Sequence, residues 1–270
     1  MVHRLVGVGV GPGDPELLTL AGQRELRAAG RVFVPVLGPD ESGRAEAVVR
    51  AHVADDAVIE RLTFALADPV DGRQQRRHRH WDAAAERIVE YLRSGAGTAA
   101  FATIGDPSVY STFGYLAATV RSLLPDAEIR TIPGITAMQA AASAAGITLV
   151  EGAEPLTVLP VTRNVTSVAD RIEAGGTVVV YKGGRRLSAL RDVITRSGAL
   201  DRAMYAEHLG TPDARVLPLS EVDIAEPGSA TGTDVGNDGT VDGTDRTVGD
   251  APYLSTVVVL PPRGGRGEQL

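Results

Sequence analysis

The chain has 270 residues, which is enough for one large domain or two of ordinary size. It contains no cysteine, which excludes disulfides, thiolate metal sites and a cysteine nucleophile. Its formal net charge of −7 argues against nucleic-acid binding, which needs a strong basic patch, and no apolar run approaches the length of a membrane span. The first residues lack the apolar core of a signal peptide, so we expect a cytoplasmic protein.

Apolar strands alternate with helical patterns through the first half of the chain. This alternation is typical of βαβ units and of a mostly parallel sheet. Thr19 is expected to cap the first helix. We expect strands at 5–10, 31–36, 57–62, 98–104 and 128–132, and helices at 19–29, 45–53, 81–92 and from 109 onwards.

A second series of elements begins after residue 134, so we expect two α/β domains, 1–130 and 131–265. Residues 226–250 are dominated by Gly, Thr and Asp, a composition that predicts a flexible insertion, placed between two strands at a hairpin tip. Expected helices are 137–145, 168–173 and 187–194, and expected strands are 156–161, 177–181, 203–206, 215–219 and 253–260.

Two glycine-bearing turns follow strands of the first series. The first, Gly7 to Asp14, fails the dinucleotide-binding pattern, because Pro12 or Asp14 stands where the third glycine belongs. It is no phosphate-binding P-loop either, since no Gly-Lys-Ser/Thr follows. The second turn is Gly105-Asp106-Pro107. Ligands of open α/β sheets bind at the carboxyl edge of the strands, so the two turns predict one ligand site there; ordinary structural turns are the alternative.

Three blocks together resemble the signature of a known family. They are Gly9-x-Gly-Pro-Gly-Asp14-Pro-x-Leu-Leu-Thr19, the run Gly105-Asp106-Pro107-x-x-Tyr110-Ser111-Thr112, and Pro133-Gly134-Ile135-Thr136-Ala137. In this order and spacing they resemble the tetrapyrrole (corrin/porphyrin) methylases, with a match from residue 5 to about 261. The resemblance implies the two-domain class III methyltransferase fold, with a mostly parallel N-terminal sheet, a mixed C-terminal sheet and the active site in the cleft between them.

The resemblance also implies a reaction. Family members transfer a methyl group from S-adenosyl-L-methionine, leaving S-adenosyl-L-homocysteine, and are usually homodimers. Residues 105–116 and the closing 252–256 most resemble the branch that methylates C20 of precorrin-2, or of its cobalt complex cobalt-factor II, to give precorrin-3A in cobalamin biosynthesis. Siblings acting on another corrin carbon or on uroporphyrinogen III remain an alternative, as do a nucleotide-binding oxidoreductase and a non-catalytic binding module. The resemblance implies that the protein itself requires no metal.

Positions that match the family's cofactor contacts fall on several turns and strand ends. Lys182, the only lysine, has the alternative of a solvated cation at a strand end. The implied cofactor-binding residues are Pro12, Gly105, Asp106, Val109, Ser111, Thr112, Ile135, Thr136, Ala137, Tyr181, Lys182, Ala206, Glu207, Pro252, Tyr253 and Ser255.

The implied acceptor is a polycarboxylate, which arginine forks suit well. The densest basic segment, 71–81, supplies Arg73, Arg76 and Arg77 as candidates, with a solvated helix start as the equal alternative and RNA binding as a weaker one. Tyr110 and Asp14 complete the acceptor candidates. Methyl transfer needs no covalent enzyme intermediate, so catalysis would come mainly from positioning the two substrates. Asp14 is the candidate to orient or deprotonate the macrocycle.

Overall fold

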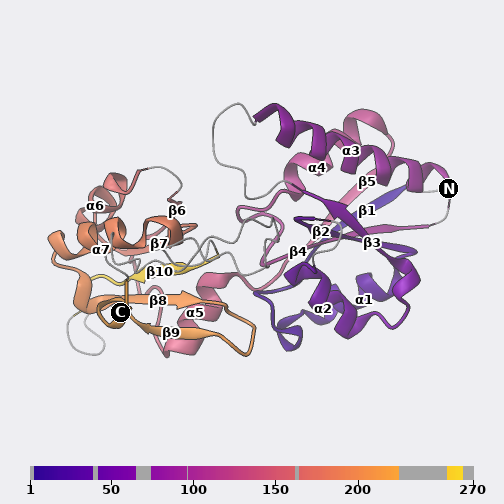
Figure 1. Cartoon of the computed structure of the whole chain (residues 1–270). Coiled ribbons are helices and arrows are strands. Elements are labelled where there is room, and N and C mark those ends of the chain that lie inside the picture. The colour runs from indigo at the N-terminus through magenta and orange to yellow at the C-terminus, as the bar shows by residue number, and fades with distance from the viewer. Residues whose placement is uncertain are drawn as a thin grey trace, which may run out of the picture. The chain divides into compact units, whose positions relative to one another are not determined.

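A computed structural model describes residues 3–38, 42–64, 74–95, 97–161, 164–224 and 254–263, with side chains omitted at 74–79. The chain forms two compact units that divide between Thr136 and Ala137 (Figure 1). The expected boundary after residue 130 falls inside β5 (Glu128–Ile132). It is displaced because β5 pairs along its whole length with β1 (Arg4–Gly9), which makes it an integral strand of the first unit.

The first unit is built on a five-stranded parallel sheet in the order β3-β2-β4-β1-β5. From β1 the chain moves to β2 on one side, and from β4 it moves to β5 on the other. The carboxyl ends of β1 and β4 therefore flank the topological switch point, where ligands of open α/β sheets bind. The remaining strands are β2 (Arg31–Val36), β3 (Ile59–Thr63) and β4 (Ala99–Thr103).

Helices cover both faces of this sheet (Figure 1). On one face, α1 (Leu20–Ala28) and α2 (Arg44–His52) pack on the valines of β1 and β2. On the other, α3 (Gln74–Arg93) and α4 (Phe113–Leu123) enclose a core that includes Phe33, Phe64 and Phe101. The expected cap of α1 is confirmed, because Thr19 Oγ1 accepts a hydrogen bond from the Gly22 amide at 3.0 Å.

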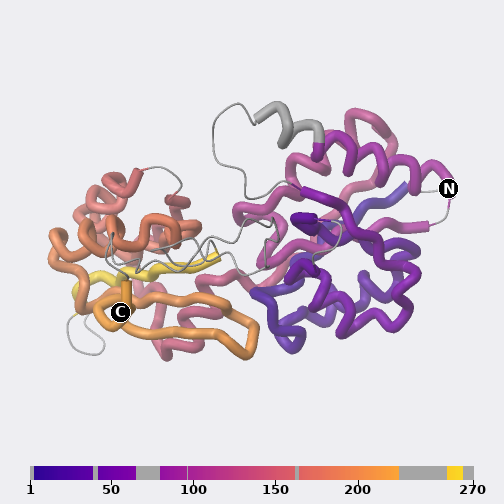
Figure 2. The backbone as a smooth tube through the Cα atoms, viewed as in Figure 1, coloured from indigo at the N-terminus to yellow at the C-terminus, as the bar shows by residue number. Residues whose placement is uncertain are grey.

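The second unit is built on a mixed sheet in the order β6-β7-β10-β8-β9. Only β6 and β7 are parallel; the last strand, β10, lies antiparallel between β7 and β8 (the yellow segment of Figure 2). Helices α6 and α7 pack on one face and the small-residue helix α5 on the other. The bounds are α5 (Ala137–Ala145), β6 (Leu156–Pro160), α6 (Thr166–Glu173), β7 (Thr177–Tyr181), α7 (Leu187–Arg196), β8 (Ala203–Glu207), β9 (Arg215–Pro218) and β10 (Thr256–Val259).

Two sequence expectations about local structure are wrong. The helix expected from residue 109 begins at Phe113, because residues 106–112 form a turn in which the Val109 amide donates to Asp106 O. β9 and β10 form no hairpin, because β8 lies between them in the sheet. The proposed insertion at 226–250 lies outside the described residues. Short 3-10 helices complete the structure: Pro15–Leu17, Asp56–Val58, Gly184–Arg186, Leu200–Arg202 and Leu219–Glu221.

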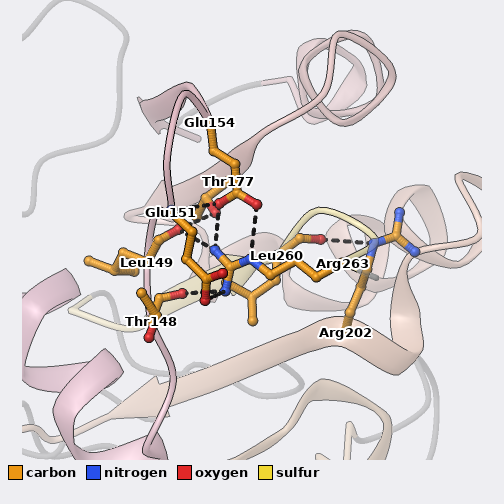
Figure 3. Close-up of polar contacts among 8 residues, drawn as sticks. All are labelled: Thr148, Leu149, Glu151, Glu154, Thr177, Arg202, Leu260 and Arg263. Atoms are coloured by element: carbon orange, nitrogen blue, oxygen red, sulfur yellow. Dashed lines mark hydrogen bonds and ion pairs between the residues drawn. The ribbon is translucent and has the colours of Figure 1, made fainter. Parts of the chain in front are cut away.

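An arginine after β10 ties the end of the described chain to the segment that follows α5 (Figure 3). The Arg263 guanidinium contacts the Glu154 carboxylate at 3.0 and 2.6 Å and donates to the carbonyls of Thr148 and Leu149. Arg202 donates to Leu260 O at 2.8 Å from the other side. These contacts stabilise the central strand of the second sheet at its C-terminal end.

Candidate functional site

The two glycine turns of the first unit are hydrogen-bonded to each other. The Gly105 amide donates to Gly11 O at 2.7 Å and the Gly11 amide donates to Gly105 O at 3.4 Å, forming an isolated antiparallel bridge. Both glycines have positive φ, 78° at Gly11 and 70° at Gly105, which favours glycine over other residues. The sequence prediction that both turns occupy one edge of the sheet is therefore confirmed.

A third loop, the Pro133-Gly134 turn after β5, packs backbone to backbone against these two. A Cβ added to Gly134 would lie 2.1 Å from Gly105 O, and one added to Gly9 would lie 2.6 Å from the same oxygen. Glycine is required at these two positions because the loops interlock. At Gly105, by contrast, a Cβ would meet nothing within 4 Å, so the space beside its main chain is open.

The Asp106 carboxylate joins two of these loops. Its Oδ2 accepts from the Gly134 amide at 2.9 Å, while Oδ1 accepts from the Ser108 amide at 2.8 Å and from the Ser108 hydroxyl. Burial raises the pKa of Asp106, but these hydrogen bonds outweigh burial and hold the pKa below its ordinary value. Both oxygens of the Asp106 carboxylate therefore accept hydrogen bonds from the protein's own turns.

The residues before α4 show how the turn presents its backbone. Ser111 Oγ lies 3.0 Å from Thr103 Oγ1 and accepts from the Phe113 amide at 3.1 Å. Thr112 occupies the N-cap position without a side-chain cap bond. Tyr110 has φ 51° and is 43% exposed. A non-glycine residue in the left-handed region is strained, and such strain clusters at functional sites.

The other candidates of the first unit lie on the same loops. Pro12 is buried between two glycines with positive φ. Asp14 accepts from the Glu16 amide at 2.9 Å and so caps a 3-10 turn. Thr136 is buried, Ile135 beside it is half-buried, and Ala137 begins α5. Arg76 and Arg77 fall on the first turns of α3, whereas Arg73 lies outside the described residues.

In the second unit, candidates gather at one edge of the mixed sheet. Tyr181 ends β7, and Thr256 lies opposite both Tyr181 and Ala206 in the strand register. The Tyr181 hydroxyl accepts from the Met138 amide at 2.9 Å, which ties the strand end to the start of α5. Just beyond the strands, Lys182 has φ 61° and His208 has φ 51°. The strain at His208 follows a strand end, but no sequence pattern predicted it.

Glu207 and Ser255 belong to a buried polar network that sequence analysis missed. Glu207 accepts from the Tyr205 hydroxyl at 2.8 Å and from Arg215 at 2.9 Å. Burial, followed by the Glu207 carboxylate, raises the pKa of Tyr205. Ser255 acts in the opposite direction on Tyr205, because it lowers the pKa of the tyrosine hydroxyl. Glu207 is therefore committed to protein partners through its side chain. The Pro252 and Tyr253 candidates lie outside the described residues.

Each unit, taken by itself, has one further feature that bears on ligand binding. The first unit offers open space beside the main chain at Gly105. In the second, Thr256 Oγ1 is buried and has no hydrogen-bond partner among the described residues. An orphaned buried hydroxyl costs about 1–3 kcal/mol. The described part of the chain has no group of three or more His, Cys, Asp or Glu side chains that could hold a metal ion.

Comparisons with known proteins agree on one family. Residues 4–223 match the family model of the Tetrapyrrole (Corrin/Porphyrin) Methylases. A precorrin-2 C(20)-methyltransferase of Sinorhizobium sp is 34% identical over 224 residues, which are 82% of this chain and 89% of the relative. A probable cobalt-precorrin-2 C(20)-methyltransferase of Methanocaldococcus jannaschii is 34% identical over 184 residues, 67% of this chain and 73% of the relative.

Solved structures support the fold. The methyltransferase CobJ matches with a TM-score of 0.60 at 19% identity, covering 97% of both chains. At this identity the likeness concerns the fold, and it agrees with the parallel and mixed sheets seen here. None of the described helices is long and apolar enough to span a membrane.

Proposed function

The chain belongs to the tetrapyrrole (corrin/porphyrin) methylase family, and from this premise we propose that it methylates C20 of precorrin-2 or of cobalt-factor II. S-adenosylmethionine-dependent C-methylation of a tetrapyrrole in cobalamin biosynthesis is the activity that the family and the relatives support. The choice of C20 rests on the identity of 34% to two relatives whose names specify that carbon.

The observation that carries the proposal is the interlocked set of three loops at the carboxyl edge of the parallel sheet. Gly11, Gly105 and Gly134 belong to three different strand ends, yet their backbones are in direct contact. A rigid backbone surface of this kind can bind a cofactor without charged side chains, because main-chain amides and carbonyls suit an adenine and an amino-acid end. We assign Gly105, Asp106 and Val109 to cofactor binding through their main chains.

The residues of the second unit would contribute further cofactor contacts. Tyr181, Lys182 and Ala206 lie at the edge that also holds the Thr256 hydroxyl. Backbone strain at Lys182 is consistent with a role in binding. The Tyr181 hydroxyl accepts from the Met138 amide, which fixes the tyrosine ring at this strand end.

When bound, S-adenosylmethionine would supply an electrophilic methyl group for an in-line transfer to the ring carbon, with the methyl–sulfur bond breaking to leave S-adenosylhomocysteine. The protein's task is then to hold the two partners in that geometry, which supplies most of the rate enhancement. We assign Asp14, Tyr110 and the arginines at 73, 76 and 77 to the acceptor. Asp14 would orient the macrocycle and accept the proton that leaves the methylated carbon. We also propose that the protein is a homodimer, which light scattering on the purified chain would test.

A labelled-methyl assay tests the function. Purified protein is incubated with methyl-labelled S-adenosylmethionine and, in separate reactions, with precorrin-2, cobalt-factor II or uroporphyrinogen III, and NMR locates the labelled carbon. We expect label at C20 with one of the first two acceptors. Label at another carbon, or on uroporphyrinogen III, would assign the chain to a sibling activity. Absence of any transfer, together with NADH binding and no S-adenosylhomocysteine binding, would favour an oxidoreductase.

A further inference from the structure

His52 connects helix α2 to the loop that carries Asp14. Its Nε2 lies 2.9 Å from Pro15 O, and a carbonyl oxygen can only accept, so Nε2 bears the hydrogen. The Nδ1 lies 3.0 Å from Gln23 Nε2, an amide donor, so Nδ1 accepts. The two contacts together assign the donor role to Nε2 and the acceptor role to Nδ1. His52 is thus a fixed bridge from the last residue of α2 to the glycine-rich loop.

The bonded carbonyl has a specific place in that loop. Pro15 directly follows Asp14 and begins the 3-10 turn that the Asp14 carboxylate caps. Pro15 O also accepts from the Leu18 amide at 3.2 Å, and Asp14 O accepts from the Leu17 amide at 3.1 Å. Holding Pro15 O therefore fixes the turn from outside. Without that contact, the orientation of Asp14 would depend on a single short turn.

We propose that His52 is a positioning residue, which fixes the Asp14–Pro15 turn so that Asp14 faces the tetrapyrrole acceptor; this rests on the acceptor role proposed for Asp14. His52 acts through the main chain of the loop and touches neither reactant. The side chain is half-buried between α1 and the loop, so its position is set by packing as well as by Gln23. Precise placement of a reacting group is worth large factors in rate, and small displacements are costly.

Two substitutions test the contacts of the two ring nitrogen atoms separately. In His52→Asn the side-chain amide reaches the place of Nδ1, so the contact to Gln23 can persist while the donor to Pro15 is lost. In His52→Gln the amide nitrogen stands as many bonds from Cα as Nε2 does, so the donor to Pro15 is restored. Arg27→Gln is the control. Arg27 donates to His52 O at 3.0 Å and joins the same two helices, but it does not contact the loop.

Hydrogen exchange and kinetics are measured on the four proteins. We expect His52→Asn to speed exchange of the Leu17 and Leu18 amides by about fivefold, the loss of one ordinary hydrogen bond, and to raise the acceptor KM by a similar factor. The Kd for S-adenosylhomocysteine and the exchange elsewhere should stay within twofold. His52→Gln should restore both values, and Arg27→Gln should leave the two amides unchanged.

Other results would overturn the proposal. Unchanged exchange at Leu17 and Leu18 in His52→Asn would show that the loop does not depend on His52. Equal loss of acceptor and S-adenosylhomocysteine binding, without rescue by His52→Gln, would show general destabilisation instead. If the wild-type protein methylates no tetrapyrrole, the proposed function fails, and the exchange measurement alone still decides whether His52 fixes the turn.

Discussion

The carboxylate of Asp106 accepts a hydrogen bond from the amide of Gly134 at 2.9 Å, across 28 residues of sequence. The bond connects the turn after β4 to the turn after β5, and the Gly105–Gly11 bridge connects the first of these to the turn after β1. One acidic side chain and one pair of glycines thus hold three strand ends together. Without these contacts, the loops would become ordered only when a ligand binds. The entropy lost in that ordering would weaken the ligand's affinity.

Asp106→Asn tests this cross-link. Asparagine has a single acceptor oxygen, so either Gly134 or Ser108 loses its bond, at a cost of about 1–3 kcal/mol. We expect the Kd for S-adenosylhomocysteine to rise by about tenfold, measured by calorimetry. An unchanged Kd together with unchanged stability would show that the carboxylate does not organise the loops.

The same residue predicts a pH dependence with a definite sign. The folded pKa of Asp106 is lowered, so ionised Asp106 stabilises the native state at pH values above the unfolded value of about 3.9. This contribution is lost as the pH falls through the folded pKa. In urea titrations, the stability difference between wild type and Asp106→Asn should be constant from about pH 5 to about pH 7, because Asp106 is ionised there in both the folded and the unfolded state. The difference should shrink below about pH 4. A difference that grows toward acid pH would contradict this assignment.

Gly134→Ala tests the interlocking of the loops. The new Cβ would lie 2.1 Å from Gly105 O, so the backbone must shift. We expect a loss of about 1–3 kcal/mol in stability and weaker S-adenosylhomocysteine binding. Gly114→Ala is the matched control: Gly114 lies within α4, where a Cβ meets nothing within 4 Å, and alanine favours a helix by about 1 kcal/mol. The control should raise the Tm and leave binding unchanged.

The sequence predicted the order of strands and helices because alternating apolar periodicities determine which segments form a parallel sheet. It also placed the turns of Asp14 and Asp106 at one edge, which follows from the common direction of parallel strands. It did not predict that Gly134 and Gly9 are required for loop packing, because that depends on contacts between distant backbones. The start of α4 at Phe113 was missed for a related reason. The apolar residues from position 109 onwards have helical spacing, but the left-handed backbone of Tyr110 prevents a helix from beginning before Phe113.

In the second unit, residue type alone could not distinguish ligand contacts from internal structure. Glu207 follows the expected strand 203–206 and was assigned to the cofactor, yet in the structure it ends β8 and its carboxylate is bound by Tyr205 and Arg215. These partners lie on β8 itself and on the neighbouring strand β9, and only the strand register brings Arg215 opposite Glu207. Thr256 belongs to the closing segment 252–256 but was not a candidate site residue, since its unpartnered hydroxyl becomes notable only once it is buried.

Tyr205→Phe tests the buried network around Glu207. The change removes the donor at 2.8 Å and leaves one carboxylate oxygen buried with a partner missing. The expected loss of stability is about 1–3 kcal/mol, measured by urea unfolding. Tyr115→Phe is the control, because Tyr115 is 61% exposed and stacks on Trp81 through its ring, which phenylalanine retains. Equal effects of the two substitutions would show that the Tyr205 hydroxyl contributes nothing specific.

Arg263→Leu tests the contacts shown in Figure 3. The leucine loses the bonds to Glu154 and to the carbonyls of Thr148 and Leu149, so we expect the Tm to fall by several degrees. In the control Arg130→Leu, only a 3.9 Å ion pair between half-exposed side chains is lost, and such pairs contribute little. A Tm that falls equally in both variants would mean that the Arg263 contacts do not anchor the chain end.

Asp14→Asn tests the proposed proton acceptor in the first glycine loop. The amide oxygen of asparagine can still accept from the Glu16 amide, so the turn keeps its cap while the carboxylate is lost. Loss of a general base lowers kcat by about 10² to 10⁴-fold, and we expect a fall in this range with an unchanged Kd for S-adenosylhomocysteine. Asp14→Ala removes the cap as well, so it should lower kcat at least as far and also raise the acceptor KM. If both variants turn over the tetrapyrrole at the wild-type rate and bind S-adenosylhomocysteine normally, Asp14 has no part in the reaction, and the proton must leave to another group or to water.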